Sequence, residues 1–377
     1  MKIVRLSLTL FLIVSFVAAA VDRKLIAECG KGYLETVDGY PVLHLKGTPQ
    51  EMGTQHGTLL KEHIRRNIQY LLHGREDIKL DFCGIKLTPM MIAAGINEIF
   101  SDKIPPDYIA EMKTLAKAAD VPELEVFATN LIPELFHCSG FALLKDAGST
   151  GRLYHGRVLD YGVDWKLQDH AVLIIAEPEG KIPFVNVSYA GFIGSVTGMN
   201  TEQISIGEMG GGGVGMWNGI PMSFLVRMVL EQAGSLEQAV SVFTDNPRTC
   251  EYYYVIADAR ADDAAGLWCL PEKVERVNPG SFHELLPEPV ENTVLLSSGK
   301  RYANLARLVR ENYGKFDEHA AIRLMDHPVA MKSNLHNALM IPQDGVIYVA
   351  NADKDGSPAW QQKYYRFDMN ELIENRP

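Results

Sequence analysis

The sequence predicts an α+β fold in which two mainly antiparallel sheets pack together and helices cover their outer faces. From Cys138 onward, segments typical of strands come in a run, helices follow, and strands then resume, an order that favours stacked sheets. A doubly wound parallel sheet would need strict alternation of strand and helix, which the sequence lacks. An apolar content of 47% is enough for a sizeable core and excludes a disordered chain.

The first twenty residues are typical of a signal peptide. Lys2 and Arg5 supply positive charge, an apolar stretch follows, and Ala18-Ala19-Ala20 offers an A-x-A cleavage site. The stretch is short for a membrane span and charged residues follow it at once, which favours export over a membrane anchor. We therefore expect residues 1–20 to be removed and the mature chain to be secreted, periplasmic or lumenal, with no stable anchor.

The next segment, residues 21–137, is predicted to be mostly helical. Thr48-Pro49-Gln50-Glu51 is typical of a capping box with proline at the first helical position, and the helix it opens can end at Gly74. A second helix is expected from Pro105 to Ala119 and a third from Glu123 to Leu131.

From Cys138 onward the pattern changes to strands. They are expected at 141–144, 153–159, 171–176, 183–189, 204–209, 252–257, 266–270, 293–297, 336–341, 346–350 and 363–367. Helices are expected at 221–233, 235–243, 302–312 and 320–325.

The first two of these strands bring three chemical groups together. A loop centred on Gly148 would pair Cys138 with Val158, leaving Arg157 beside the thiol and Asp160 just past the strand end. A nearby guanidinium lowers a thiol pKa. If the chain is cut before Cys138, its new α-amine, with a pKa of about 8, suits a general base. A carboxylate that binds this amine would orient it.

These residues resemble a known family. The segments His137 to Phe141 and Tyr154 to Tyr161 are similar to the N-terminal-nucleophile cysteine hydrolases, and most similar to the acyl-CoA:6-aminopenicillanic acid acyltransferase group. Choloylglycine hydrolases and acid ceramidase are more distant relatives of that group. The upstream segment Gly47 to Gly57 is similar to the group's propeptide motif, and downstream motifs follow in the expected order.

The resemblance implies a four-layer αββα sandwich and cleavage between His137 and Cys138. The chain would then consist of a pro-segment, residues 21–137, and a hydrolase domain, residues 138–377, which remain associated. Cys138 is expected to be the nucleophile, and no cofactor or metal is implied.

The resemblance also assigns the surrounding residues. Arg157 is expected to lie beside the thiol and Asp160 to hold the α-amine, while the backbone at Asn200 would contribute to an oxyanion hole. Ser297 follows a strand where the choloylglycine relatives carry an oxyanion asparagine, and Arg301 is the candidate for a later basic residue.

The implied reaction is cleavage of a small-molecule N-acyl amide through a thioester. Transfer of the acyl group to an amine remains open, as does ceramidase-like or bile-salt-hydrolase-like cleavage, because water and amines compete for one thioester. A catalytically silent binding protein with the same fold is the alternative outside enzymes.

Several other classes lack sequence support. A net charge of −11 without a basic block argues against a nucleic-acid partner. No C-x-x-C or H-E-x-x-H motif indicates a metal site, and the glycine run 210–213 lacks phosphate-loop spacing. The local signature of a papain-like cysteine is missing. Among the five cysteines, Cys250 and Cys269 flank an expected hairpin and could form a disulfide.

Overall fold

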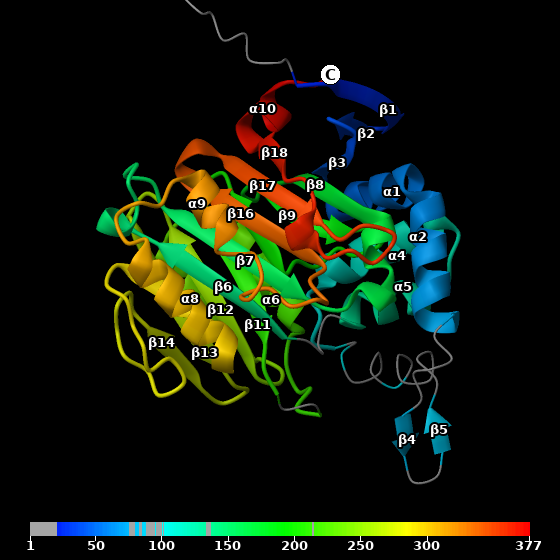
Figure 1. The fold of residues 1–377 in the computed structure, drawn as a ribbon. Helices are drawn as coiled ribbons and strands as arrows, with labels where there is room; N and C mark the ends of the chain where they lie inside the picture. Colours follow the sequence, from blue (N-terminus) through cyan, green and yellow to red (C-terminus); the bar gives the residue numbers. More distant parts are fainter. Residues whose placement is uncertain are drawn as a thin grey trace, which may run out of the picture.

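The computed structural model describes residues 21–74, 80–82, 85–87, 95, 100, 102–132, 137–212 and 215–377. In this part of the chain two large sheets face each other, with helices outside both (Figure 1). The predicted α+β class with two mainly antiparallel sheets is therefore confirmed. The predicted signal peptide, residues 1–20, lies outside the described residues. No helix among those described is long and apolar enough to span a bilayer.

The larger sheet joins strands from both predicted segments of the chain. Its order is β1-β2-β3-β8-β9-β10-β11-β12-β13-β14. Neighbours are antiparallel except β3 and β8, which pair in parallel. The strands span Arg23–Cys29, Gly32–Val37, Tyr40–Gly47, Ala171–Pro178, Phe184–Tyr189, Thr197–Asn200, Ile204–Gly210, Tyr252–Asp258, Asp263–Cys269 and Val274–Val277.

The smaller sheet carries Cys138. Its order is β15-β6-β7-β16-β17-β18, all antiparallel. The strands span, in that order, Thr293–Leu296, His137–Leu143, Tyr154–Asp160, His336–Ile341, Val346–Asn351 and Tyr365–Asp368. Strands β6 and β7 pack against β11 of the larger sheet, and β6 also packs against β12. A separate short hairpin consists of β4 (Leu80–Phe82) and β5 (Ile85–Leu87).

Helices form the outer layers. α6 (Met222–Gln232) and α7 (Leu236–Asp245) pack on the larger sheet, whereas α8 (Gly299–Glu311) and α9 (Glu318–Arg323) pack on the smaller one. The remaining helices are α1 (Pro49–Leu59), α2 (Lys61–Ile68), the π-helical η1 (Gln69–His73), α4 (Pro106–Ala119), α5 (Glu123–Leu131) and α10 (Met369–Glu374). Short 3-10 turns are η3 (Lys145–Ala147), η4 (Val163–Trp165), η5 (Leu167–His170), η6 (Pro342–Asp344) and η7 (Ala359–Gln361).

Local capping chemistry starts the first helix as expected. The Glu51 N–H donates to the Thr48 hydroxyl, and the Thr48 N–H donates to the Glu51 carboxylate, which completes the capping box. The helix does not run unbroken to Gly74, however, because α1 ends at Leu59 and α2 begins at Lys61.

The main difference from the prediction lies before α1. Strands β1 to β3 were not predicted, and they join residues 21–137 to the larger sheet through the β3–β8 pairing. Much of β1 is exposed and has no simple alternation of buried and exposed residues, so no strand pattern is visible there in the sequence. Strands β10 and β14 and helix α10, each of four to six residues, were also not predicted.

Candidate active site

The β6–β7 hairpin places Cys138 opposite Leu159. The predicted partner, Val158, was therefore wrong by one residue, because the 3-10 turn η3 makes the loop asymmetric about Gly148. A shift of one residue moves side chains to the opposite face of a strand. In the observed register Arg157 pairs with Gly140, so Cys138, Leu159 and Arg157 share one face without any bulge.

Arg157 is fully buried between the two sheets. One end of its guanidinium donates to the Val158 carbonyl, and Nη2 lies 3.3 Å from the Glu208 carboxylate on β11. The facing strand makes room for it at Gly207, where a Cβ atom would lie 2.9 Å from the Arg157 Cδ atom. The larger sheet thus leaves space at Gly207 for the Arg157 side chain, and it supplies the Glu208 carboxylate that pairs with the guanidinium.

The thiol of Cys138 is buried. Burial raises the pKa of Cys138 to about 12; the charge of Arg157 opposes this shift, and the carboxylates of Glu208 and Asp160 add to it. At neutral pH the thiol is therefore protonated in this structure. The lowering of the pKa expected from Arg157 is smaller than the rise caused by the loss of water around the sulfur.

Asp160 is the last residue of β7, and its side chain points to the face opposite the thiol. Its Oδ2 accepts a hydrogen bond from Arg301 Nη1 at 2.6 Å, and its Oδ1 accepts one from the Met331 N–H at 3.0 Å. Burial raises the pKa of Asp160, and the bonds from Met331 and Arg301 oppose the shift. These two donors hold the Asp160 carboxylate at the end of β7.

Ser139 connects this carboxylate to the end of β15. Its hydroxyl lies 2.7 Å from the Ser297 hydroxyl and 3.2 Å from Arg301 Nη1. The structure therefore brings Ser297 and Arg301 together with Asp160 and with Ser139, the residue that follows Cys138. Both positions lie just after β15, whose Leu296 pairs with Gly140.

Cys138 lines a cavity of about 340 Å³ between the two sheets. Most of the wall is apolar; among the residues that line it are Met209, Leu267, Trp268, Val277, Leu286 and Leu296. Ser297 and Arg301 contribute polar groups at one side, and Gly210 and Gly211 of the glycine run border it. Cavities of this size and character accept small molecules with an apolar part.

Asn200 is not part of this arrangement. Its amide donates to the carbonyls of Leu230 and Ala233, and its oxygen accepts the N–H groups of Glu202 and Ile204. Ile204 starts β11, whereas the cavity lies at the other end of that strand, about 17 Å away. The structure therefore does not bring Asn200 next to Cys138, and its side chain joins the start of β11 to the end of α6.

One charged residue of the site was missed in the sequence. Glu208 is buried and pairs with Arg157, yet it lies in the strand Ile204-Ser205-Ile206-Gly207-Glu208, whose other members are apolar or small. A carboxylate within such a buried strand needs a partner of opposite charge. An acidic residue in an otherwise apolar strand was therefore the signal in the sequence that could have identified Glu208. No disulfide joins Cys250 and Cys269, a pairing that the sequence left open.

The position of Arg157 on the same sheet face as Cys138 gives a prediction for the protein that we expect to be cleaved before Cys138. Removing the guanidinium in Arg157→Ala should raise the thiol pKa and slow alkylation of Cys138 by iodoacetamide at mildly acidic pH. Arg157→Lys should restore the low thiol pKa only in part, because lysine keeps the positive charge but lacks the planar guanidinium group. Rates against pH, measured after mass spectrometry has verified cleavage, would test this; three superimposable profiles would contradict it.

The chain is similar to one family model and to several known proteins. Residues 147–282 match the family model described as acyl-coenzyme A:6-aminopenicillanic acid acyl-transferase. The chain is 24% identical over 380 residues to Protein dcd1B of Dictyostelium discoideum, covering 89% of this chain and 75% of that protein. It is 25% identical over 226 residues to acid ceramidase of Rattus norvegicus, covering 53% of this chain and 56% of that protein.

Among solved structures, an N-acylethanolamine-hydrolyzing acid amidase ortholog of Caenorhabditis elegans aligns with a TM-score of 0.45 and 17% identity. That alignment covers 61% of this chain and 100% of the other. The family model and the acid ceramidase match confirm the resemblance that the motifs around Cys138 predicted. They support amide hydrolysis or acyl transfer as the general class of reaction.

Proposed function

We propose that this chain, a relative of the acyl-CoA:6-aminopenicillanic acid acyltransferases and acid ceramidases, is a self-processing cysteine amidase. It would cleave an N-acyl amide with an apolar acyl group through a thioester on Cys138. The observation that carries the proposal is the position of Cys138 in the wall of a largely apolar cavity. Arg157 shares its sheet face, and the Asp160–Arg301 pair lies on the other side of the strand.

Maturation would begin at the peptide bond between His137 and Cys138. The Cys138 sulfur attacks the His137 carbonyl carbon, the C–N bond breaks, and the nitrogen takes a proton to become the α-amine of Cys138. Water then cleaves the resulting thioester, which leaves a carboxylate on His137 and a free thiol. The scissile bond lies in β6, where His137 pairs with Asp160, so the carboxylate is near the new amine.

In turnover the α-amine would take the thiol proton, and the thiolate would attack the substrate carbonyl carbon. The C–N bond then breaks, the proton passes to the departing amine, and the acyl group stays on Cys138 as a thioester. Water, activated by the α-amine, releases the acid and restores the thiol. Asp160 would orient the amine, and the Ser297 hydroxyl is the candidate donor to the transient oxyanion.

The two chains would remain associated after cleavage. Strand β3 of the pro-segment pairs with β8 of the hydrolase domain over six residue pairs, from Val42 with Leu173 to Gly47 with Pro178. His56 and Asn67 of the pro-segment also bind the backbone at Gly191 and Ala190. Removal of the pro-segment would leave an open edge on the larger sheet, an unfavourable outcome.

Two other outcomes share the same site. An amine that reaches the thioester before water would make the protein an acyltransferase. A silent binding protein would keep the cavity but show no cleavage. The match to acid ceramidase and the apolar cavity favour a lipid-like N-acyl amide as substrate. Export of the chain is part of the same proposal and follows from residues 1–20.

Intact-mass spectrometry of the purified protein, before and after an activated acyl ester, tests the proposal. We expect two species, residues 21–137 and 138–377, and an added acyl mass on the second that maps to Cys138. An unprocessed chain that turns over substrate would contradict self-cleavage. An acyl group found on another residue would contradict the role of Cys138.

A further inference from the structure

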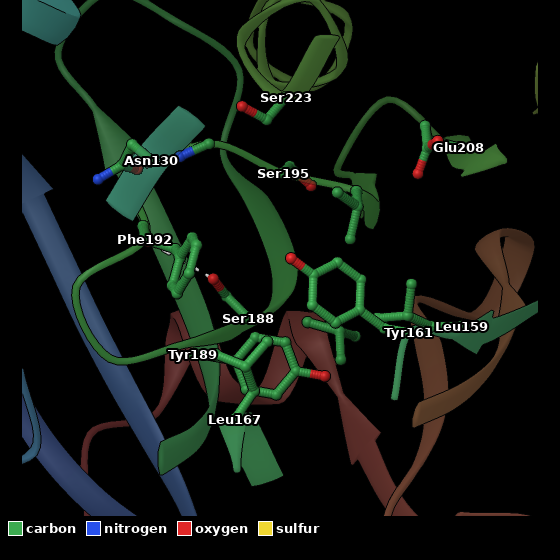
Figure 2. A pocket seen from close by; sticks show the side chains of 13 residues that line it. Asn130, Leu159, Tyr161, Leu167, Ser188, Tyr189, Phe192, Ser195, Glu208 and Ser223 are labelled. Atoms are coloured by element: carbon green, nitrogen blue, oxygen red, sulfur yellow. Dashed lines mark hydrogen bonds between the residues drawn. The ribbon is translucent and has the colours of Figure 1, made fainter. Parts of the chain in front are cut away.

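Two hollows lie near the candidate site, and one of them borders Cys138. The smaller, of about 40 Å³, is lined by Tyr161, Tyr189 and Glu208 among others, and Cys138 is not part of its lining (Figure 2). The larger, of about 340 Å³, is lined by Cys138. An acyl group on the Cys138 sulfur would therefore extend into the larger cavity, and the walls of that cavity determine how firmly it is held.

Glu251 connects three parts of this wall. It immediately precedes β12, and its Oε1 accepts hydrogen bonds from the Tyr253 hydroxyl at 2.6 Å and from Trp268 Nε1 at 2.9 Å. Its Oε2 accepts the Gly212 N–H at 2.9 Å. Tyr253, Trp268 and Gly211 line the cavity, whereas Glu251 is not part of the lining. The carboxylate therefore acts on the cavity through the residues that it binds.

The backbone of the glycine run is shaped around the same side chain. The Glu251 N–H donates to the Gly212 carbonyl at 2.9 Å, and the Gly211 N–H donates to the Glu251 carbonyl at 3.0 Å, which continues the β11–β12 pairing. A Cβ atom at Gly211 would lie 2.7 Å from the Glu251 Cγ atom. Glycine at this position thus lets the Glu251 side chain pack directly on the backbone of the cavity wall.

Tyr253 and Trp268 line the part of the cavity that lies away from β6. Met209 pairs with Tyr253, and Tyr253 pairs with Trp268, so the three side chains form a row on one face of β11, β12 and β13. Met209 lies against β6, because a Cβ atom at Gly140 would be 3.1 Å from its sulfur. Strands are about 4.8 Å apart, which places Trp268 about 10 Å further across the sheet.

Both rings are held by their polar atoms. Burial raises the pKa of Tyr253, and the hydrogen bond to Glu251 raises it further, so the phenol stays protonated and donates. The Lys273 Nζ atom lies 4.7 Å from the centroid of the Trp268 ring. Because the Tyr253 hydroxyl and the Trp268 N–H both bind Glu251, the two rings offer mainly carbon surface to the cavity.

We propose that Glu251 is a positioning residue: it fixes the Tyr253–Trp268 wall and thereby determines how strongly the cavity binds the part of an acyl group farthest from Cys138. The acyl group as ligand rests on the proposed amidase function. Without the carboxylate, both rings lose the acceptor that orients them. Binding would then have to immobilise them again, which weakens the binding of acyl groups that reach β13.

The test compares processed protein on three amides of one fluorogenic amine, with acetyl, hexanoyl or dodecanoyl as the acyl group. In Glu251→Ala we expect kcat/KM to fall roughly tenfold for the dodecanoyl amide, as for one lost hydrogen bond, and progressively less for the shorter ones. The loss should appear mainly in KM, because the wall binds ground state and transition state alike. Glu251→Gln should recover part of it, since its oxygen can still accept from the rings while its NH₂ group faces the Gly212 N–H.

Tyr253→Phe removes one of the bonds to Glu251 and should reproduce part of the length-dependent loss. Combined with Glu251→Ala it should add little, because both changes break the same bond. Glu237→Ala is the matched control: Glu237 is exposed and pairs with Arg276, which lies on the opposite face of the larger sheet from Trp268. It should keep the unaltered profile. A loss equal for all three acyl groups, or additive effects of the Tyr253 and Glu251 variants, would overturn the inference.

Binding of dodecanoate separates this inference from the proposed function, because it needs no turnover. Calorimetry should show a Kd roughly tenfold higher for Glu251→Ala than for the unaltered protein. An unchanged Kd, or no binding to the unaltered protein, would overturn the role of Glu251. Weaker binding to Glu251→Ala, together with a Cys138 that never carries an acyl group, would support the role of Glu251 and contradict the amidase proposal alone.

Discussion

Cys138→Ala is expected to remain a single chain from about residue 21 to 377 and to lose activity by roughly a millionfold. In the proposed mechanism the same sulfur is the nucleophile of self-cleavage and of turnover, so one substitution should abolish both. Cys138→Ser should still cleave, but slowly, because a hydroxyl is the weaker nucleophile. Denaturing electrophoresis and intact mass report the cleavage, and amide hydrolysis reports the turnover.

Cys269→Ala is the matched control. Cys269 is also a buried free thiol, and burial raises its pKa to about 12, yet it does not line the cavity. This variant should cleave itself and turn over substrate like the unaltered protein. Hydrolysis by Cys138→Ala at the normal rate would mean that another residue is the nucleophile.

Arg227→Met is expected to separate the pro-segment from the hydrolase domain after cleavage. Arg227 of α6 donates to both carboxylate oxygens of Glu111 on α4, at 3.0 and 2.7 Å, and its Nε donates to Glu231 at 2.8 Å. All three residues are buried. Loss of the cation would leave Glu111 unpaired, at a cost of about 3–5 kcal/mol.

Size-exclusion chromatography of the cleaved variant would measure the association, and urea unfolding of the uncut chain would measure stability. The double variant Arg227→Met with Glu111→Leu should recover most of the stability, because no buried charge is left alone. Arg307→Met, which breaks the exposed pair with Glu311, should cost less than about 0.5 kcal/mol. A stable, fully associated Arg227→Met protein would show that the buried pair does not hold the chains together.

Local sequence signals predicted the helices well because their causes are local. The capping box at Thr48 and Glu51 forms as expected, and α5 has the predicted bounds Glu123–Leu131. Most strands after Cys138 were also predicted within a few residues, since they are buried and rich in apolar side chains. The short β10 and the exposed β1 gave no such pattern.

From the order of the strands alone, the sequence could predict only those site residues that the β6–β7 hairpin brings together. Arg157 and Asp160 lie near Cys138 because β6 and β7 are consecutive strands, although the loop turn η3 shifted the register by one residue. The family resemblance also directed attention to Ser297 and Arg301, which line the same cavity. Asn200, whose backbone was expected in the oxyanion hole, does not line the cavity, and its side-chain amide binds the end of α6.

By itself the sequence determined the α+β class and the adjacency of the two consecutive strands that carry Cys138 and Arg157. Both depend on hydrophobic periodicity or on residues close together along the chain. Only the tertiary structure decided that Glu208 pairs with Arg157 and that β3 pairs with β8. These contacts join residues far apart in sequence. The first exists because two sheets stack face to face, and the second because β3 and β8 lie side by side in one sheet, and no local pattern specifies either arrangement.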